Sequence, residues 1–377
     1  MVIEVEGAPE PRILIFAGAG ASVAVSPEYP TTRGFFERLP KETTIDGCFV
    51  LLQQYLEEVR QTKEIDIETI LWAIREVQTT YRNVIRDSPS AFLLRNGGNQ
   101  FGGLNHGLIE GQMNVLLPRL DALESAINTQ IYRLYSRSPV PKDALAETWL
   151  PLLQQTTSIY RHVDLFTTNY DCILEHVIDE ANIPIATSRG RGTYNSLNLS
   201  AWSGEKARST QLLTKLHGSV DWRWAGPENK DIYVGNPWFS GSHDQHVVIY
   251  PGFKGVPDRE PFITLHNHFA DCVREASAVV FIGFAFRDEY LNRVLAAELR
   301  RNAILVAVDP KATLWPEVTP SWARGMTHVR KPFGLEAVDA ILGELAGCVR
   351  PSSQKGSSKT DPGQKPDSRT TEGDTVH

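Results

Sequence analysis

The 377-residue chain has only four cysteines, and no two of them are close together in the sequence. Cys48, Cys172, Cys272 and Cys348 form no CxxC pair, which argues against a zinc ribbon or a redox-active dithiol. Isolated cysteines usually act as small buried apolar residues, as in proteins of a reducing compartment.

The sequence also lacks a long apolar run and an excess of basic charge. No run reaches the roughly 18 apolar residues that are needed to span a bilayer. The first six residues carry acidic side chains, whereas a signal peptide begins with basic ones. A formal net charge of −7 argues against binding nucleic acid through the overall charge, but it does not exclude binding through a local basic groove. We therefore predict a cytoplasmic protein without direct membrane contact.

The composition, with 41% hydrophobic and 22% charged residues, is typical of a globular protein with a large core. The end of the chain differs, because Val376 is the only aliphatic residue after position 350. Such a segment cannot bury enough apolar surface to offset its chain entropy. We predict a folded domain over residues 10–349 and a disordered tail over residues 350–377.

Apolar, β-branched runs alternate with segments of helical spacing along the folded part. This alternation predicts an α/β fold with a Rossmann-like, doubly wound parallel sheet. The runs that we interpret as buried parallel strands are Ile13–Phe16, Val163–Phe166, Leu212–Leu216, Val247–Tyr250, Ala278–Ile282 and Ile304–Val308.

A large helical insertion separates the first two predicted strands. Residues 45–160 carry apolar side chains at helical spacing, interrupted by a glycine-rich link over residues 96–104. A second irregular stretch, residues 188–208, is polar and contains glycine, and we predict a long surface loop there.

The first predicted strand runs directly into glycines. The sequence Ile13-Leu-Ile-Phe-Ala-Gly-Ala-Gly-Ala-Ser22 places Gly18 and Gly20 where α/β folds bind a dinucleotide pyrophosphate. Taken alone the motif is weak, because Val23 or Ala24 stands where a third glycine is usual.

Polar residues follow the next two strands. Asn169 and Asp171 lie in Thr167-Thr-Asn-Tyr-Asp171, and Asp171 also suits the N-cap of the following helix. His217 follows the strand that ends at Leu216 and is a candidate general base. The alternatives are a plain strand-to-helix turn for the first motif and a structural histidine for the second.

Two later strands end in the same manner. Gly283 follows the strand that ends at Ile282 and permits a close backbone approach. Asp309 follows the strand that ends at Val308, where an acidic residue commonly binds a nucleotide ribose; a simple turn before Pro310 is the alternative. Because parallel strands share one carboxyl edge, all five motifs are expected to face one crevice.

The ordered set GAGAS, TTNYD, LHG and GFAFRD resembles the sirtuin superfamily. It is most similar to the bacterial sirtuin-like branch that hydrolyses NAD in anti-phage defence systems. The resemblance implies that NAD is bound as a substrate, that Asn169 orders water or the ribose, and that His217 is the base. The residues that it places around the dinucleotide are Gly18, Ala19, Gly20, Ser22, Arg33, Asp171, Gly283, Phe284 and Asp309.

The sequence also departs from the deacetylating sirtuins. Those enzymes resemble one another in a four-cysteine zinc module, an Asp-Phe-Arg in the cofactor loop and a Phe-Gly-Glu after the histidine, and all three are missing here. Residues 248–252, Val-Ile-Tyr-Pro-Gly, stand where Phe-Gly-Glu is expected. These differences favour NAD hydrolysis over deacetylation, with no metal required.

We therefore expect an NAD glycohydrolase that releases nicotinamide and either ADP-ribose or a cyclised product. Its relatives imply control by self-assembly or by a partner chain, such as a HerA-type ATPase or an Argonaute-like protein, with the helical insertion as the contact surface. Three alternatives stay open: a protein deacylase, a non-catalytic NAD or ADP-ribose sensor, and an ordinary nucleotide-binding α/β enzyme.

Overall fold

The computed structural model describes most of the predicted domain. The described ranges are residues 10–31, 34–61, 65–85, 106–136, 140–188, 194–225, 231–235, 246–248, 260–311 and 321–348. Arg33, the glycine-rich link and the predicted tail lie outside these ranges.

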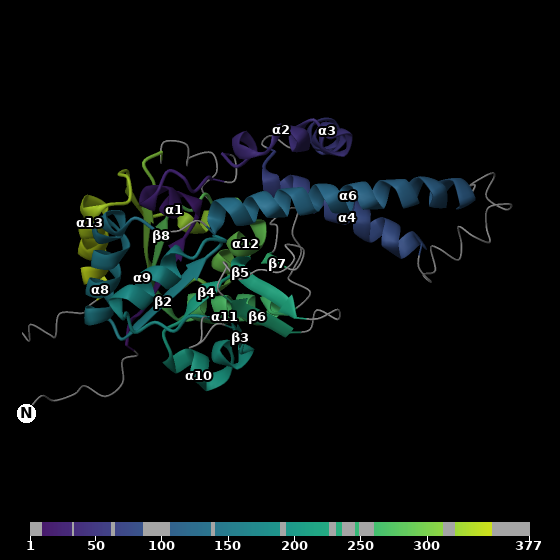
Figure 1. Ribbon diagram of the computed structural model, residues 1–377. Helices are drawn as coiled ribbons and strands as arrows, with labels where there is room; N and C mark the ends of the chain where they lie inside the picture. Colours follow the sequence, from purple (N-terminus) through teal and green to yellow (C-terminus); the bar gives the residue numbers. More distant parts are fainter. Residues whose placement is uncertain are drawn as a thin grey trace, which may run out of the picture.

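A six-stranded parallel sheet forms the centre of the molecule, with strand order β10-β9-β8-β1-β2-β4 (Figure 1). Five of the six runs predicted as parallel strands belong to it, and β10 is an addition. The strands are β1 (Arg12–Ala17), β2 (His162–Thr167), β4 (Leu213–Lys215), β8 (Ala276–Ile282), β9 (Ile304–Val308) and β10 (Thr327–Val329).

Helices cover both faces of this sheet, which confirms the doubly wound α/β fold. Alternate residues of β1 enter two separate cores, Ile13 and Ile15 on one side and Leu14 and Phe16 on the other. The first core is shared with α1 (Ala19–Val25), α8 (Trp149–Ile159), α9 (Ile173–Ala181) and α13 (Leu335–Leu345). The second is shared with α11 (Phe262–Glu275) and α12 (Glu289–Glu298).

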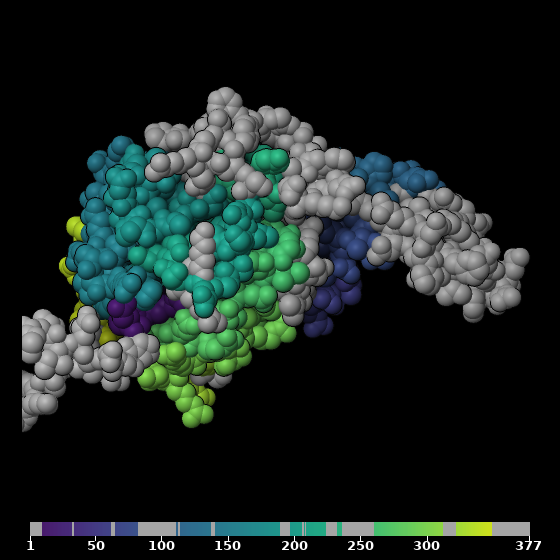
Figure 2. All heavy atoms as spheres, turned by 90° about the horizontal axis from the view of Figure 1, so that it is seen from below, coloured from purple at the N-terminus to yellow at the C-terminus, as the bar shows by residue number. Residues whose placement is uncertain are grey.

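The predicted helical insertion between β1 and β2 is present and extends to one side of the sheet (Figures 1 and 2). Its two long helices are joined by polar contacts, including Arg75 Nε to Glu124 Oε1 at 2.7 Å. Within the ranges given above, no helix is both long and apolar enough to cross a membrane. The elements of the helical insertion are η1 (Phe36–Arg38), α2 (Lys41–Thr44), α3 (Gly47–Gln54), the π-helix η2 (Tyr55–Val59), α4 (Ile67–Ile85), α6 (His106–Tyr135) and α7 (Lys142–Glu147).

The prediction of a parallel strand over Val247–Tyr250 was wrong for Val247 and Val248, while residues 249 and 250 lie outside the described ranges. The structure has a strand over His246–Val248 (β7), which pairs antiparallel with β5 in a separate sheet of order β3-β6-β5-β7. A short apolar run fits either kind of sheet, so its pairing partner decides the direction. The other strands of this sheet are β3 (Tyr194–Ser196), β5 (Gly218–Ala225) and β6 (Asp231–Gly235).

The surface loop predicted over residues 188–208 was also wrong for its described part. The chain there forms β3, the 3-10 helix η3 (Leu199–Trp202) and the start of α10 (Gly204–Ser209). Trp202 is buried and its Nε1 donates to Thr214 Oγ1 at 2.9 Å, which anchors the segment to β4. The remaining short helices are η6 (Ser321–Ala323) and η7 (Ala346–Cys348).

Candidate functional site

The structure places the predicted motifs along the carboxyl edge of the parallel sheet. Backbone hydrogen bonds continue between the segments that leave the strands: Gly18 N donates to Ile282 O at 2.9 Å, and Gly283 N donates to Val308 O at 2.9 Å. Leu216 N, just before His217, donates to Thr167 O at 2.9 Å. The predicted motifs therefore lie at one edge of the sheet, which is where α/β folds bind ligands.

The three glycines of this edge pack against one another. A Cβ on Gly18 would lie 2.5 Å from Gly283 O, and one on Gly20 would lie 2.7 Å from Gly283 Cα. Gly283 has φ +58°, and a Cβ there would overlap the backbone of Gly20 and Ala21. The close approach that these glycines permit is thus between the first loop and the turn after β8.

Phe284 and Asp309, which the resemblance places around the dinucleotide, make local contacts in the structure. Phe284 is buried, and its ring lies 4.5 Å from that of Phe16 between centroids, so it belongs to the aromatic core below the edge. Asp309 Oδ1 accepts from Lys311 N at 2.7 Å, which is the turn geometry that we weighed as the alternative.

Asn169 is fixed by a chain of hydrogen bonds. Its Nδ2 donates to Gly18 O and to Ser22 Oγ, each at 2.8 Å. The Ser22 hydroxyl donates in turn to Asp171 Oδ2 at 2.6 Å. Gly18 O and an ionised carboxylate can only accept hydrogen bonds. This chain of hydrogen bonds therefore identifies the NH₂ group of the Asn169 amide as the one that faces Gly18 and Ser22. Both amide protons are used, so Oδ1 is the atom of Asn169 that is left to accept from a ligand.

Asp171 links this chain to the following helix. Its Oδ1 accepts from Ile173 N at 3.1 Å, so it supports the start of α9 as predicted, although Cys172 occupies the N-cap position itself. The sequence alone did not indicate that Ser22 would link Asn169 to Asp171 through its hydroxyl group.

A small pocket opens beside Asn169 on the face of the sheet that α1, α8 and α9 cover. Its open space is about that of one water molecule, and its wall is half polar and half apolar side chains. It is lined by Ala17, Ala21, Ser22, Trp149, Thr167, Asn169, Asp171, Ile173, Leu174 and Glu175. His217 does not line this pocket.

A buried ion pair lies below the pocket. Lys215 Nζ is 3.1 Å from Glu175 Oε1, and it also donates to the Asp171 carbonyl oxygen. Burial alone would lower the pKa of Lys215, but the charge of Glu175 and of nearby acidic groups raises it above its usual value. The lysine is therefore a fixed cation, and it ties β4 to the segment that carries Asn169 and Asp171.

His217 lies at the neighbouring strand end and is buried. Its Nε2 is 3.1 Å from Asp288 Oδ2. Asp288 also caps the next helix, because it accepts from Tyr290 N at 3.0 Å and from Leu291 N at 3.1 Å. The contact with His217 was missed, because nothing in the local sequence indicates which side chain faces a helix cap.

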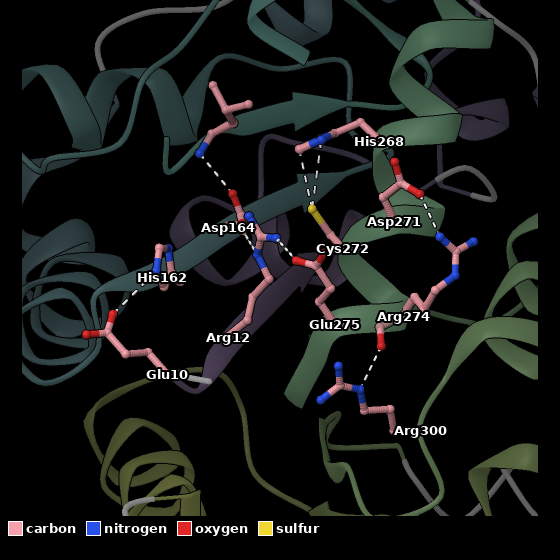
Figure 3. Close-up of polar contacts among 11 residues, drawn as sticks. Glu10, Arg12, His162, Asp164, His268, Asp271, Cys272, Arg274, Glu275 and Arg300 are labelled. Atoms are coloured by element: carbon pink, nitrogen blue, oxygen red, sulfur yellow. Dashed lines mark hydrogen bonds and ion pairs between the residues drawn. The ribbon is translucent and has the colours of Figure 1, made fainter. Parts of the chain in front are cut away.

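One group of side chains on the second face has the donor types of a metal site. Asp164, His268 and Cys272 lie close together and are buried (Figure 3). Arg12 already occupies this group, since its Nε is 2.8 Å from Asp164 Oδ2, and Asp164 Oδ1 accepts from Leu212 N. Burial raises the pKa of the Cys272 thiol, which opposes the thiolate that a metal would need. We interpret the group as a structural ion-pair network.

The second such group, Cys172, Glu175 and Asp221, has the same character. Lys215 is its built-in cation, because its ammonium contacts Glu175 directly. A divalent ion at either place would have to displace a buried basic side chain, so we assign no metal to them.

Fold and site together define a doubly wound α/β protein with a polar pocket at the carboxyl edge of its sheet. Residues 163–321 match the family model of the SIR2-like domain. This segment contains Asn169, His217, Gly283 and Asp288, whereas the glycine loop lies before it.

Comparison with solved structures gives similarity to Sir2 homologues at low sequence identity. One is a Sir2 homologue mutant in complex with ADP-ribose, with 10% identity, a TM-score of 0.40, and coverage of 90% of this chain and 93% of that chain. Another is a Sir2 homologue–NAD complex, with 10% identity, a TM-score of 0.35, and coverage of 90% of each chain. No curated protein sequence matches the chain.

Proposed function

We propose that the chain is an NAD⁺ glycohydrolase, which cleaves the bond between nicotinamide and ribose to give nicotinamide and ADP-ribose. The observation that carries the proposal is the orientation of Asn169 beside the pocket, with its amide protons held by Gly18 and Ser22. A carbonyl oxygen fixed in this way can accept a hydrogen bond from a ribose hydroxyl or from the attacking water.

The reaction needs little more than positioning and one base. When the C1′–N bond breaks, its electron pair goes to the nicotinamide ring nitrogen and neutralises the pyridinium charge. Water then attacks C1′, and His217 accepts the proton that water loses. A positioned base of this kind contributes about 10²–10⁴-fold. His217 is buried in the free protein, and such contacts often form fully only when substrate is bound.

The placement of the cysteines supports hydrolysis over protein deacylation. All four lie in described parts of the chain and none is in a disulfide bond: Cys48 is on α3, Cys172 before α9, Cys272 on α11 and Cys348 in η7. They come from four separate elements, and neither candidate metal group contains two of them. This separation differs from the clustered cysteines of a four-cysteine zinc module and so supports the proposal.

We propose that the enzyme acts in the cytoplasm as an effector of bacterial anti-phage defence, by depleting NAD. Such an activity must be silent until needed, and we propose control by self-assembly, with an ATPase or an Argonaute-like partner as the alternative. The helical insertion supports this, because it exposes large apolar side chains to solvent. They are Ile45, Val50, Leu51, Tyr55 and Val59, which lie on α3 and η2 and directly before α3.

The test is nicotinamide release from NAD⁺ by the purified full chain, alone and together with the product of the neighbouring gene. We expect Asn169→Ala and His217→Ala each to lower kcat by at least about 100-fold. Asn302→Ala and His176→Ala are matched controls on the surface and should keep wild-type activity. Light scattering on the same samples reports whether the active form is a homo-oligomer.

Each other outcome rejects a specific part of the proposal. Wild-type activity in both site variants would refute the catalytic roles of Asn169 and His217. NAD⁺ or ADP-ribose binding without turnover under every condition would identify a sensor. Nicotinamide release that requires an acetylated peptide would identify a deacylase.

A further inference from the structure

We propose that Asp288 is a positioning residue that fixes the tautomer and ring orientation of His217. The inference rests on the proposed function for the role of His217 as base, but its geometry stands by itself. Asp288 and His217 come from different parts of the sheet edge, after β8 and β4, and both are buried. The two side chains approach to 3.1 Å between Oδ2 and Nε2.

The two oxygens of Asp288 have separate partners. Oδ1 accepts from the backbone N–H groups of Tyr290 and Leu291, at 3.0 and 3.1 Å, and so caps α12. Oδ2 faces His217. An ionised carboxylate can only accept hydrogen bonds, so the proton of a neutral His217 must be on Nε2. A proton from the substrate is then taken up at Nδ1.

The turn that presents Asp288 is held in an unusual backbone conformation. Phe286 has φ +54°, in the left-handed region that non-glycine residues seldom adopt. The Asn292 side chain donates to Phe286 O at 2.7 Å, and Asn292 N donates to Asp288 O at 3.0 Å. Strain that is locked in this way is typical of sites where a side chain must be aimed, and here it aims Asp288 at the ring.

His217 in turn lies beside the segment that carries Asn169. Leu216 N donates to Thr167 O, and Val220 N donates to Tyr170 O at 3.0 Å, so the two segments run side by side. Asp288 contacts His217 from the turn after β8, as an acidic group that orients a base and stabilises its protonated form.

Asp288→Asn separates this role from simple capping. The backbone N–H groups at the start of α12 would still donate to the side-chain oxygen of the new asparagine. The NH₂ group of that side chain would then face His217 and donate to Nε2. His217 would then carry its proton on Nδ1, the wrong nitrogen. We expect kcat to fall about 10²–10⁴-fold, while KM for NAD⁺ changes less than about threefold and Tm stays near the wild-type value. Asp288→Ala should be less stable, because the cap is lost.

Asp46→Asn is the matched control. Asp46 caps α3 in the same way, accepting from Cys48 N at 2.8 Å and from Phe49 N, but it lies on the insertion away from His217. This variant should keep full activity. If Asp288 only caps a helix, Asp288→Asn will behave like Asp46→Asn, and the proposal is overturned.

A spectroscopic readout is independent of activity. In ¹⁵N-histidine-labelled protein, two-bond ¹H–¹⁵N spectra distinguish the tautomers, and His217→Gln identifies the signal. We expect the Nε2-protonated form in the wild type and the Nδ1-protonated form in Asp288→Asn. Equal patterns in both would refute the role of Asp288. A tautomer change in a chain that never cleaves NAD⁺ would refute the proposed function and leave the role of Asp288 intact.

Discussion

We expect Lys215→Met to destabilise the protein strongly, because it leaves a buried carboxylate without its cation. The Lys215 and Glu175 side chains are each only 1% exposed, and Nζ and Oε1 are 3.1 Å apart. The ammonium also binds the Asp171 carbonyl oxygen, so the substitution removes a tie between β4 and the Asn169 segment.

The magnitude follows from the distance and the burial. With an effective dielectric constant of about 20, two unit charges at this separation attract by about 5 kcal/mol. Measured losses on breaking a buried pair are about 3–5 kcal/mol, which is a large part of the 5–15 kcal/mol that stabilises a typical domain. Replacing both partners with apolar residues of similar volume removes the orphaned charge, so Lys215→Met/Glu175→Leu should recover at least about 2 kcal/mol.

The surface pair between Lys142 and Glu180 is the control, since its Nζ and Oε1 are 3.0 Å apart but the lysine side chain is 77% exposed. Lys142→Met should cost less than about 1 kcal/mol. Urea unfolding followed by circular dichroism measures the free energy of unfolding of the wild type, the two single variants and the double variant. A loss below about 1 kcal/mol for Lys215→Met, or a double variant less stable than the single one, would refute the reasoning.

Two further predictions concern the glycine contact and the buried histidine. Gly283→Ala should lower the free energy of unfolding by at least about 2 kcal/mol, because Gly283 has a positive φ and a Cβ there would overlap the backbone. Gly343→Ala is the control and should be neutral or stabilising, because Gly343 lies in α13 with open space around it. Equal melting temperatures for the two variants would contradict this prediction. Burial lowers the pKa of His268 to about 4 in the folded protein. Below about pH 6.5 this histidine therefore binds a proton more readily in the unfolded chain, and the free energy of unfolding should fall by up to about 3 kcal/mol towards pH 4. His268→Gln should lose this part of the pH dependence in denaturant titrations at pH 7 and pH 5.

Local sequence patterns predicted the parallel sheet well, because its central strands are mainly apolar runs buried on both faces, with Asp164 as a buried exception in β2. The same patterns placed Gly18, Asn169, His217 and Gly283 at strand ends, and parallel strands bring their ends to one edge. The patterns were misleading for Val247–Tyr250 and for residues 188–208. The first segment is short and its direction depends on pairing with β5, whereas the second is held by the buried side chain of Trp202.

The sequence by itself determined the fold class and the edge of the sheet where the chemistry must lie, since both follow from periodicity and from strand ends. The tertiary structure decided which side chains meet there. It joined Asn169 to Ser22 and Asp171, paired Lys215 with Glu175, and set Asp288 against His217. The residues in direct contact in these pairs are 40 to 149 positions apart in the sequence. Contacts over such separations arise from the packing of whole elements, and no local pattern encodes them.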